Sequence, residues 1–600
     1  MILHKFRSKK PPGSDGRQKG KMMPAGKLPT TRWQLREGDD RTQTILINEL
    51  GLSPIISRIL MSRDIVDLDD ARRFLSPSLR DLHNPFLMQD MQKAVDRLSR
   101  AIYRQEKVII YGDYDADGIT SVVVLLHFIR QIHKNVSYYI PDRITEGYGL
   151  HTAAVDRLQS EAVSLIVTVD CGISDHASIA HARKCGIDTI ILDHHEISDT
   201  LPDAVAAVNP NRKDCRFPFK NLAAVGIVFN FLIALRSTLR REGLWKKDSY
   251  PNLKEYLDLV ALGTIGDIAP LVDENRIFAK IGLDLMTEDR RIGISALKMV
   301  SGMEHQVIDS SKASFSLIPR INAAGRIASS QVAVELLLAE NRGQADELAR
   351  KLDGFNRKRQ AMEKVIFNEL LEQVGDQFES GKVGPLVFAS HNWHPGVIGI
   401  VASRMVDRFG RPAILISLKN GIGKGSGRSV ADFNIYQGLK SCESLLLSYG
   451  GHRYAAGISI REEDIGEFSA RLKEVVYVNS PVIDFTACTT IDAQCNLTDI
   501  NHELLSQFDQ LAPFGNKNPE PLLCVRKVNV ASPSIVGNNH LKMRVSSGGV
   551  SRNSIWFGSG QFLQELSAAI LDIVFTPQLN IWNGSSDIQL KMKDVAVQVL

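Results

Sequence analysis

Short runs of β-type residues alternate with helical patterns from Lys107 to His195, and this alternation limits the possible folds more than any other feature of the chain. The runs KVIIYG, VSYYIP, SLIVTVDCG and DTIILDHH are separated by segments with helical spacing. This alternation predicts βαβ units and an α/β fold with a parallel, doubly wound sheet. Ligands of such sheets gather outside the carboxyl ends of the strands. The sequence therefore also predicts where a functional site would lie.

Acidic and histidine side chains stand at these predicted strand ends. The segment IIYGDYDADG, residues 109–118, ends in three aspartates at alternate positions, Asp113, Asp115 and Asp117. Alternate residues of an extended segment point the same way, and like charges so close repel one another unless cations lie among them. Later segments add Asp170 in VTVDCG, Asp193, His194 and His195 in LDHH, and Asp267 in GTIGD. A solvated acidic turn would explain one such position, whereas their recurrence predicts a metal site.

The donor atoms limit which metal the site would prefer. Carboxylate oxygens with one or two imidazoles form a hard to borderline site, which suits Mn²⁺ or Mg²⁺, and the histidines favour Mn²⁺. Zinc is the weaker candidate. The seven cysteines form no Cys-x-x-Cys pair, which argues against a thiolate zinc site or a disulfide framework. We therefore expect a reducing, cytoplasmic environment.

The rest of the chain divides into further predicted regions. Residues 341–380 have long helical spacing with little Gly or Pro, which predicts a connecting helix after a first α/β domain at 41–340. The pattern of residues 381–480 predicts a smaller α/β domain that contains the glycine-rich segments GIGKGSGRS and GGHRYAAG. Residues 481–600 contain short alternating strands, which predict an OB-like β-barrel.

The net charge of +4 is distributed unevenly. The first 36 residues hold ten of the 72 Lys and Arg but only one of the 68 Asp and Glu, so the remainder is net acidic. A nucleic-acid partner would then have to bind in local grooves. Residues 1–40 are expected to form a basic disordered tail, which is either translated from an upstream start before Met22 or Met23 or serves as a phosphate-binding arm. No apolar run is long enough to span a membrane.

The motifs also occur in a recognisable order. DYDADG, VTVDCG, LDHH and GTIGDIAPL resemble the Asp-His-His (DHH) phosphoesterase superfamily, and WHPGVIGIVASR, GSGRS and GGHRYAAG resemble its associated DHHA1 domain. PRINAAGR, residues 319–326, and APFGNKNPEP, residues 512–521, are similar to segments of its branch of single-strand-specific 5′→3′ exonucleases. Two positions depart from the pattern. Tyr111 stands where the superfamily often has a metal-binding His, and Lys517 stands where Gly is common.

The resemblance implies a site with two ions, Mn²⁺ or Mg²⁺. In it, Asp170 would bridge the ions and His195 would contact the scissile phosphate. The implied metal ligands are Asp113, Asp115, Asp117, Asp170, His194 and Asp267, and the implied catalytic residues are His195, Asp113 and Asp170.

The resemblance also implies how DNA would be held. A narrow cleft between the α/β domains would admit one strand, and the barrel would extend the track with stacking aromatics, for which Trp556, Phe557 and Phe514 are candidates. Glycine-rich backbone and a forked guanidinium near Arg428 would hold a terminal phosphate. The residues expected to face the 5′-phosphate or the DNA are Arg143, Arg320, Asn322, Arg326, Ser426, Arg428 and His452.

We therefore expect a single-stranded-DNA exonuclease that releases 5′-mononucleotides during DNA recombination and repair, with a single-strand-binding protein and a helicase as partners. One alternative is a superfamily relative that acts on small nucleotides as a phosphodiesterase or pyrophosphatase, but such an enzyme would not need the barrel. Another is a noncatalytic scaffold that binds single-stranded DNA and derives from a phosphoesterase domain that has lost its activity. Such a domain would have lost metal-ligand residues, whereas the acids and histidines are all present here.

Overall fold

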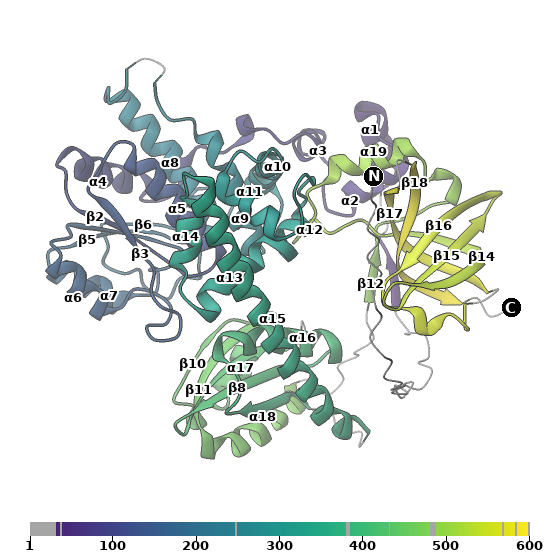
Figure 1. Ribbon diagram of the computed structural model, residues 1–600. Coiled ribbons are helices and arrows are strands. Elements are labelled where there is room, and N and C mark those ends of the chain that lie inside the picture. Colours follow the sequence, from purple (N-terminus) through teal and green to yellow (C-terminus); the bar gives the residue numbers. More distant parts are fainter. Residues whose placement is uncertain are drawn as a thin grey trace, which may run out of the picture.

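The computed structural model describes residues 32–36, 39–246, 249–379, 384–430, 433–479, 488–566, 569–582 and 585–597. It confirms the predicted fold class. Figure 1 shows a lobe built on a parallel sheet, a smaller α/β domain beside it and a β-barrel at the C-terminal end. Residues 1–31 of the predicted tail lie outside the described residues, whereas residues 32–35 form a strand. Among the described helices none is long and apolar enough to cross a lipid bilayer.

The parallel-sheet lobe, which runs from α4 to α14, contains a five-stranded sheet in the order β3-β2-β4-β5-β6, with all neighbours parallel. The strands are β2 (Val108–Gly112), β3 (Val136–Tyr139), β4 (Leu165–Val169), β5 (Asp188–Leu192) and β6 (Ala206–Val208). Alternate residues of β2 enter different hydrophobic clusters: Ile110 packs on one face of the sheet, and Ile109 and Tyr111 pack on the other. Both faces are thus buried, as a parallel sheet requires.

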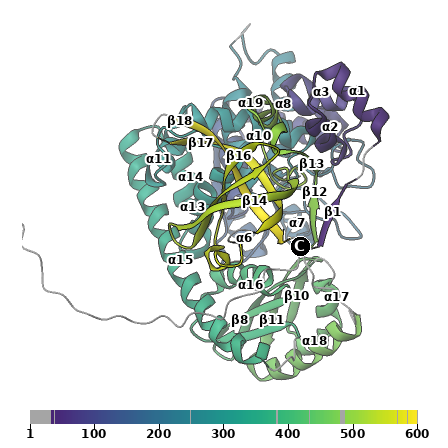
Figure 2. The same cartoon turned by 90° about the vertical axis from the view of Figure 1, so that its right-hand side faces the viewer.

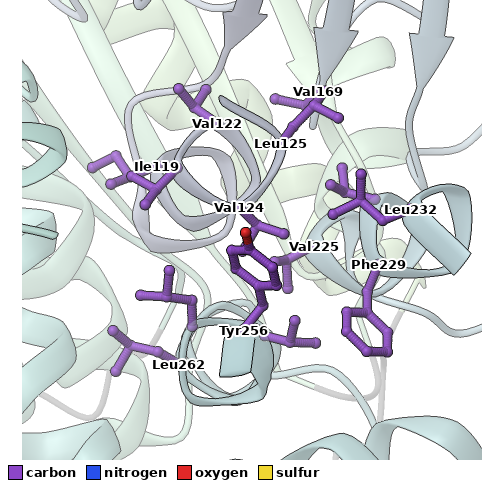
Figure 3. Close-up of a cluster of buried hydrophobic side chains, with 14 of the residues drawn as sticks. Ile119, Val122, Val124, Leu125, Val169, Val225, Phe229, Leu232, Tyr256 and Leu262 are labelled. Atoms are coloured by element: carbon purple, nitrogen blue, oxygen red, sulfur yellow. The ribbon is translucent and has the colours of Figure 1, made fainter. Parts of the chain in front are cut away.

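Helices cover the two faces of this sheet. The first cluster contains residues of α4 (Met91–Tyr103), α5 (Ala116–Arg130) and α8 (Ala224–Arg241), and the second contains residues of α6 (Thr152–Ser160) and α7 (His176–Lys184). Figure 3 shows Ile119, Val122 and Leu125 of α5 in the same apolar cluster as Val225, Phe229 and Leu232 of α8. This packing fixes the starts of α5 and α8 against each other.

A further layer of helices extends the lobe. It consists of α9 (Leu257–Gly266), α10 (Asp273–Thr287), α11 (Ile292–Val300), α12 (Ser310–Lys312), the π-helical turn η4 (Ala313–Leu317), α13 (Ile318–Ile327) and α14 (Gln331–Leu337). Glycines allow α9 to approach α5 closely. A Cβ at Gly263 would lie 2.3 Å from Thr120 Oγ1, and one at Gly266 would lie 2.8 Å from the Ala116 Cβ. The end of α9 therefore reaches the carboxyl edge of the sheet.

The long helix α15 (Arg342–Glu379) leads from the lobe into the small domain, residues 384–479, and Figure 2 shows it running between the two. The small domain has a five-stranded sheet in the order β10-β11-β9-β8-β7. Its elements are β7 (Leu386–Ser390), α16 (Pro395–Phe409), β8 (Ala413–Lys419), β9 (Ile422–Arg428), α17 (Ile435–Lys440), β10 (Ser448–Gly451), β11 (Ala455–Arg461) and α18 (Ile465–Asn479). Residues of α15 and α16 share one hydrophobic cluster, and residues of α17 and α18 share another.

The barrel domain, residues 488–597, closes through the pairing of β14 with β17. Its elements are β12 (Cys488–Ile491), β13 (Ala493–Gln494), α19 (His502–Leu511), β14 (Leu523–Val536), β15 (His540–Ser547), β16 (Val550–Trp556), β17 (Ile570–Trp582) and β18 (Ser585–Val597). This agrees with the predicted OB-like barrel.

The N-terminal helices belong to the core of this barrel domain. Sequence pattern places residues 41–340 in one domain, whereas α1 (Asp40–Leu50), α2 (Pro54–Met61) and α3 (Leu68–Leu75) bury Leu46, Ile56 and Ile59 in one cluster with Leu504 and Phe508 of α19. In addition, β1 (Arg32–Leu35) pairs with β12 in parallel. The physical reason is that these amphipathic helices need an apolar partner, and the barrel domain supplies it.

A buried arginine joins the barrel domain to the parallel-sheet lobe. Arg276 of α10 is 2 % exposed, and its guanidinium reaches from the lobe across the junction to donate hydrogen bonds to main-chain oxygens of the barrel domain and of α3, which packs with it. The acceptors are the carbonyl oxygens of Phe74 at 2.8 Å, Gln510 at 2.8 Å, Leu511 at 3.0 Å and Ala512 at 3.0 Å. The guanidinium also lies 3.8 Å from the centre of the Phe74 ring.

Candidate active site

The loop that carries Asp113, Asp115 and Asp117 follows β2, and the beginnings of two helices hold it in place. Asp115 caps α5, because its Oδ1 accepts hydrogen bonds from the main-chain N–H groups of Asp117 at 2.9 Å and Gly118 at 3.2 Å. The carboxylate of Asp117 accepts from the N–H groups of Ala224 at 2.7 Å and Val225 at 2.9 Å, at the start of α8. Packing of α5 on α8 therefore fixes the positions of both carboxylates.

The second and third strand ends bring further donors to the same place. Asp170 follows β4 with a φ of 60°, and Tyr148 donates a hydrogen bond to its carbonyl oxygen at 3.0 Å. His194 lies between two acids, since its Nε2 is 3.2 Å from Asp170 Oδ1 and its Nδ1 is 3.7 Å from Asp267 Oδ2. The structure thus gathers all six predicted metal ligands.

These ligand atoms form overlapping groups. Within each group the ligand atoms all lie within 4.8 Å of one another, and the three groups at this edge of the sheet are Asp113, Asp115 and Asp170; Asp117, His194 and Asp267; and Asp170, His194 and His195. Asp170 is common to two of them, which suits a bridging position. A cavity of about 260 Å³, lined in part by His194, Asp267 and Lys220, opens beside the groups.

We call these three ligand groups together the acidic centre, and its electrostatics favour the binding of cations. Asp113, Asp117 and Asp170 are each at most 5 % exposed, and Asp113 Oδ1 is buried without a hydrogen-bond partner. Burial and the neighbouring carboxylates raise the pKa of Asp113 and Asp170 well above their ordinary values. The same causes raise the pKa of Asp117 to about 7, and burial raises that of Asp267 to about 6. A buried set of oxygen and imidazole donors with an unpartnered oxygen fits Mn²⁺ or Mg²⁺.

Asp193 orients His195. Its Oδ1 lies 2.7 Å from His195 Nδ1 and also accepts hydrogen bonds from the main-chain N–H groups of both histidines. Burial alone would raise the pKa of Asp193, but the hydrogen bond from the His195 ring and the charges of both histidines lower that pKa to about 2. Burial would likewise lower the pKa of His195, but Asp193 and Asp170 raise it to about 9. Asp193 therefore fixes the imidazole and its charge without belonging to the three ligand groups.

The PRINAAGR segment supports the acidic loop. Asn322, a predicted DNA-facing residue, accepts a hydrogen bond on its Oδ1 from the Ala116 N–H at 2.8 Å. A Cβ at Gly325 would lie 2.7 Å from the Tyr114 carbonyl oxygen, to which Ser330 donates a hydrogen bond at 3.0 Å. The sequence gives no sign of the role of Ser330, because a serine just beyond a helix is commonplace.

Three predicted DNA-facing arginines lie near one another beside this loop. Arg326 Nη1 donates to the Gly396 carbonyl oxygen of α16 at 3.2 Å, and the Arg143 guanidinium lies 4.7 Å from the centre of the Tyr114 ring. Arg428 Nη1 lies 3.1 Å from Ser426 Oγ. Burial and the charge of Arg143 lower the pKa of Arg428, and burial with several neighbouring arginines lowers that of Arg326 to about 9. These guanidinium groups repel one another, so an anion among them would be stabilised.

The small domain approaches this arginine group through glycines. A Cβ at Gly399 in the first turns of α16 would lie 2.8 Å from Ser426 Oγ and 3.3 Å from Arg428 Nη2. The first turn of an α-helix also presents N–H groups to anions. We call Arg143, Arg326, Ser426 and Arg428 the arginine pocket.

The other predicted DNA-facing residues have different surroundings. Arg320 is paired with Asp353 of α15 at 2.9 Å and donates to the Ser316 carbonyl oxygen at 2.6 Å. His452 is exposed in the turn between β10 and β11, and that turn lies next to the end of β9 because Ala455 pairs with Arg428. A role for these two residues in DNA binding stays a prediction.

The candidate stacking aromatics also differ in exposure. Trp556 is 7 % exposed and stacks on Phe562 with ring centres 5.5 Å apart, so it belongs to the barrel core and the stacking role suggested for it is wrong. Phe557 is 51 % exposed, and Phe514 is partly buried. Tyr111, which replaces a common histidine, is buried and donates its hydroxyl to the Gly149 carbonyl oxygen at 2.9 Å.

Comparisons with known proteins give matches to three families. The DHH family, N-terminal domain matches residues 107–264, the DHHA1 domain matches residues 382–477, and the RecJ OB domain matches residues 491–594. Among curated proteins, the single-stranded-DNA-specific exonuclease RecJ of Bacillus subtilis is 37% identical over 94% of this chain and 71% of its own length. The protein of the same name from Salmonella typhimurium is 35% identical over 93% of this chain and 98% of its own length.

Among solved structures, this chain is again similar to RecJ proteins. RecJ from Thermus thermophilus in complex with Mn²⁺ superposes with a TM-score of 0.81 at 26% identity, covering 95% of this chain and 80% of that one. Its complex with Mg²⁺ gives a TM-score of 0.75 at 25% identity and covers 94% of this chain and 78% of that one.

Proposed function

The chain belongs to the RecJ family of exonucleases, and from this membership and the acidic centre we propose that it hydrolyses single-stranded DNA stepwise from the 5′ end with two divalent cations. The observation that carries the proposal is the position of the arginine pocket directly beside the acidic centre: Arg143 lies on Tyr114, between Asp113 and Asp115. The arginine pocket suits a terminal phosphate, and the acidic centre with its cations suits the phosphodiester next to that phosphate.

The residues of the acidic centre have separate tasks in this proposal. Asp113, Asp115 and Asp170 would hold one cation, and Asp117, His194 and Asp267 would hold the other. Asp170, whose Oδ1 lies 3.2 Å from His194 Nε2, would bridge the two. When bound, such a pair of ions lowers the pKa of an attacking water and neutralises charge on the phosphate. His195, held in one orientation by Asp193, would donate a hydrogen bond to a phosphate oxygen. The Tyr148 hydroxyl contacts the Asp170 carbonyl oxygen and the His195 ring, and the Asn209 amide donates to the His195 carbonyl oxygen. These contacts keep Asp170 and His195 in place.

The polarity follows from the place of the arginine pocket next to the acidic centre. If the arginine pocket holds the 5′-terminal phosphate, the next phosphodiester lies at the cations, and each cleavage releases a 5′-mononucleotide. A chain of this kind would act in the cytoplasm in DNA recombination and repair, on strands that a helicase opens and a single-strand-binding protein covers. The direct test is digestion of 5′- and 3′-labelled single-stranded and duplex DNA with Mn²⁺, Mg²⁺ or EDTA. Release from the 3′ label first would contradict the proposal.

Arg428→Ala is expected to weaken binding of 5′-phosphorylated single strands by about 1.5–3 kcal/mol, the range for a hydrogen bond to a charged group. Strands with a 5′-hydroxyl lack the phosphate and should lose much less. Equilibrium binding of both strands to the wild type and the variant, measured in EDTA so that no cleavage occurs, gives the comparison. Arg408→Ala, which removes an arginine of α16 outside the pocket, is the matched control. Equal losses on the two strands would mean that Arg428 contacts the backbone generally.

The raised carboxyl pKa values predict a pH-dependent response to metal. Without cations, Asp117 and Asp267 keep their protons to about pH 7 and 6 in the folded protein but lose them near pH 4 when unfolded. The folded state thus binds more protons in this window, so the free energy of unfolding of the metal-free protein falls as pH rises from about 5 to 8. Cations bind the ionised carboxylates, so the rise in melting temperature caused by Mn²⁺ should be larger at pH 8 than at pH 5. Asp267→Asn should reduce this pH dependence, and a Mn²⁺ effect equal at both pH values would contradict it.

A further inference from the structure

One loop of the barrel domain, residues 512–521, reaches the turn that follows Asp267, and we call it the Asn516 loop. Asn516 Nδ2 donates a hydrogen bond to the Ile268 carbonyl oxygen at 2.8 Å, and the Leu271 N–H donates to the Asn516 carbonyl oxygen at 2.8 Å. The backbone of the loop approaches closely, since a Cβ at Gly515 would lie 2.7 Å from Leu271 Cδ1. Ile268 directly follows Asp267, so the loop holds the turn that carries this carboxylate.

The backbone conformation of this turn is unfavourable for isoleucine, the residue at its centre. Ile268 has a φ of 58°, and the Ile268 and Ala269 N–H groups donate to the carbonyl oxygens of Ile265 at 3.1 Å and Thr264 at 3.2 Å. This pattern ends a helix with a left-handed residue, a position that is usually glycine. A β-branched residue is strained there.

Burial of the side chain does not compensate for the strain, because Ile268 is 69 % exposed. The two hydrogen bonds with Asn516 favour this conformation from outside the turn, together with the burial of Ala269 and Leu271 in the core of the lobe. Strained backbone persists where its surroundings fix it, and such positions often adjoin functional groups.

We propose that Asn516 is a positioning residue for the metal centre. By fixing the turn at Ile268 it holds the Asp267 carboxylate near His194 and Asp117, so the barrel domain sets the affinity of the parallel-sheet lobe for divalent cations. The inference rests on the proposed role of Asp267 as a metal ligand. It gives the barrel domain a task in addition to any contact with DNA.

The test is Mn²⁺ binding to the full chain, measured from the electron paramagnetic resonance signal of free Mn²⁺. Asn516→Ala should bind Mn²⁺ about tenfold more weakly, the lower part of the range for groups that orient a metal ligand. The rate at saturating Mn²⁺ should recover, whereas a general structural defect would lower the rate at every Mn²⁺ concentration. Unchanged Mn²⁺ affinity would overturn the proposal. Asn553→Ala is the matched control, because Asn553 is an asparagine of the same domain that bonds Asp587 within the barrel.

A second variant tests the role of the strain. Glycine adopts the left-handed conformation without a Cβ penalty, so Ile268→Gly should restore much of the Mn²⁺ affinity when it is combined with Asn516→Ala. Affinity that stays as low as in Asn516→Ala alone would overturn this part of the mechanism.

Two measurements separate this inference from the proposed function. Amide hydrogen exchange at Ile268 and Ala269, whose N–H groups close the turn, should be faster in Asn516→Ala when it is measured without metal, and exchange at the wild-type rate would contradict the proposed support of the turn. Asp267→Asn tests the ligand itself: if it binds Mn²⁺ as tightly as the wild type, the ligand assignment fails. Weak binding by Asp267→Asn together with normal binding by Asn516→Ala would leave the metal centre standing and remove only the positioning role.

Discussion

Asp170→Asn is expected to lower the rate of DNA cleavage by at least about 10³-fold while the chain stays folded. Asp170 belongs to two of the three ligand groups, so in the proposed two-cation site the loss of its charge would weaken the binding of both cations. Asparagine is the informative replacement, because it keeps the shape of aspartate and tolerates the φ of 60° at this position. Alanine would add backbone strain to the loss of the ligand.

The rate should be measured in a single turnover with saturating DNA and Mn²⁺, beside the circular dichroism spectrum and DNA binding in EDTA. Asp156→Asn makes the same chemical change on the exposed surface of α6 and should cleave at the wild-type rate. A rate for Asp170→Asn within tenfold of wild type would exclude a bridging carboxylate.

Arg276→Ala is expected to lower the free energy of unfolding of the junction between the barrel domain and the parallel-sheet lobe by about 3–5 kcal/mol. The replacement removes the guanidinium donors of four main-chain oxygens, at Phe74, Gln510, Leu511 and Ala512. Leu511 keeps a second donor, the Asn518 amide at 2.9 Å. The replacement also removes the guanidinium that covers the Phe74 ring. Each buried acceptor that loses its partner costs about 1–3 kcal/mol.

Urea unfolding followed by proteolysis at the junction measures this effect. Arg276→Lys keeps the charge but cannot reach four acceptors with one ammonium group, so its stability should lie between those of Arg276→Ala and the wild type. Arg183→Ala removes an exposed arginine that pairs with Asp203 and should change stability little. A loss below about 1 kcal/mol for Arg276→Ala would mean that the apolar contacts alone hold the junction.

The acidic centre could be located from sequence because its residues follow strands. The carboxyl ends of parallel strands meet at one edge of a sheet, so Asp113, Asp170 and His194 come together once β2, β4 and β5 are recognised. Asp267 is different, because it ends a helix. Only the close approach of Gly263 and Gly266 to α5 brings it to that edge, and the family resemblance, not periodicity, indicated its role.

Contacts between segments that are distant in sequence were not predictable in this way. The pattern of α2 shows which face is buried but not that Ile56 and Ile59 pack with the barrel domain. The amide of Asn516 has no sequence signal that points to Ile268. Asn322 was expected to face DNA, yet its Oδ1 accepts from the Ala116 N–H, because a side chain with donors and acceptors suits either role.

The shared core of α1–α3 and the barrel domain sets the order in which this chain can fold on the ribosome. The apolar faces of these helices are synthesised early, but their partners in α19 and the barrel strands follow more than 400 residues later, since α3 ends at Leu75 and α19 begins at His502. At ~5–20 residues per second, the interval between the two is roughly half a minute to two minutes. During synthesis the parallel-sheet lobe can fold around its own core, while the first helices remain exposed and open to chaperones. The nascent enzyme therefore completes its nuclease lobe before the core shared by α1–α3 and the barrel domain can close.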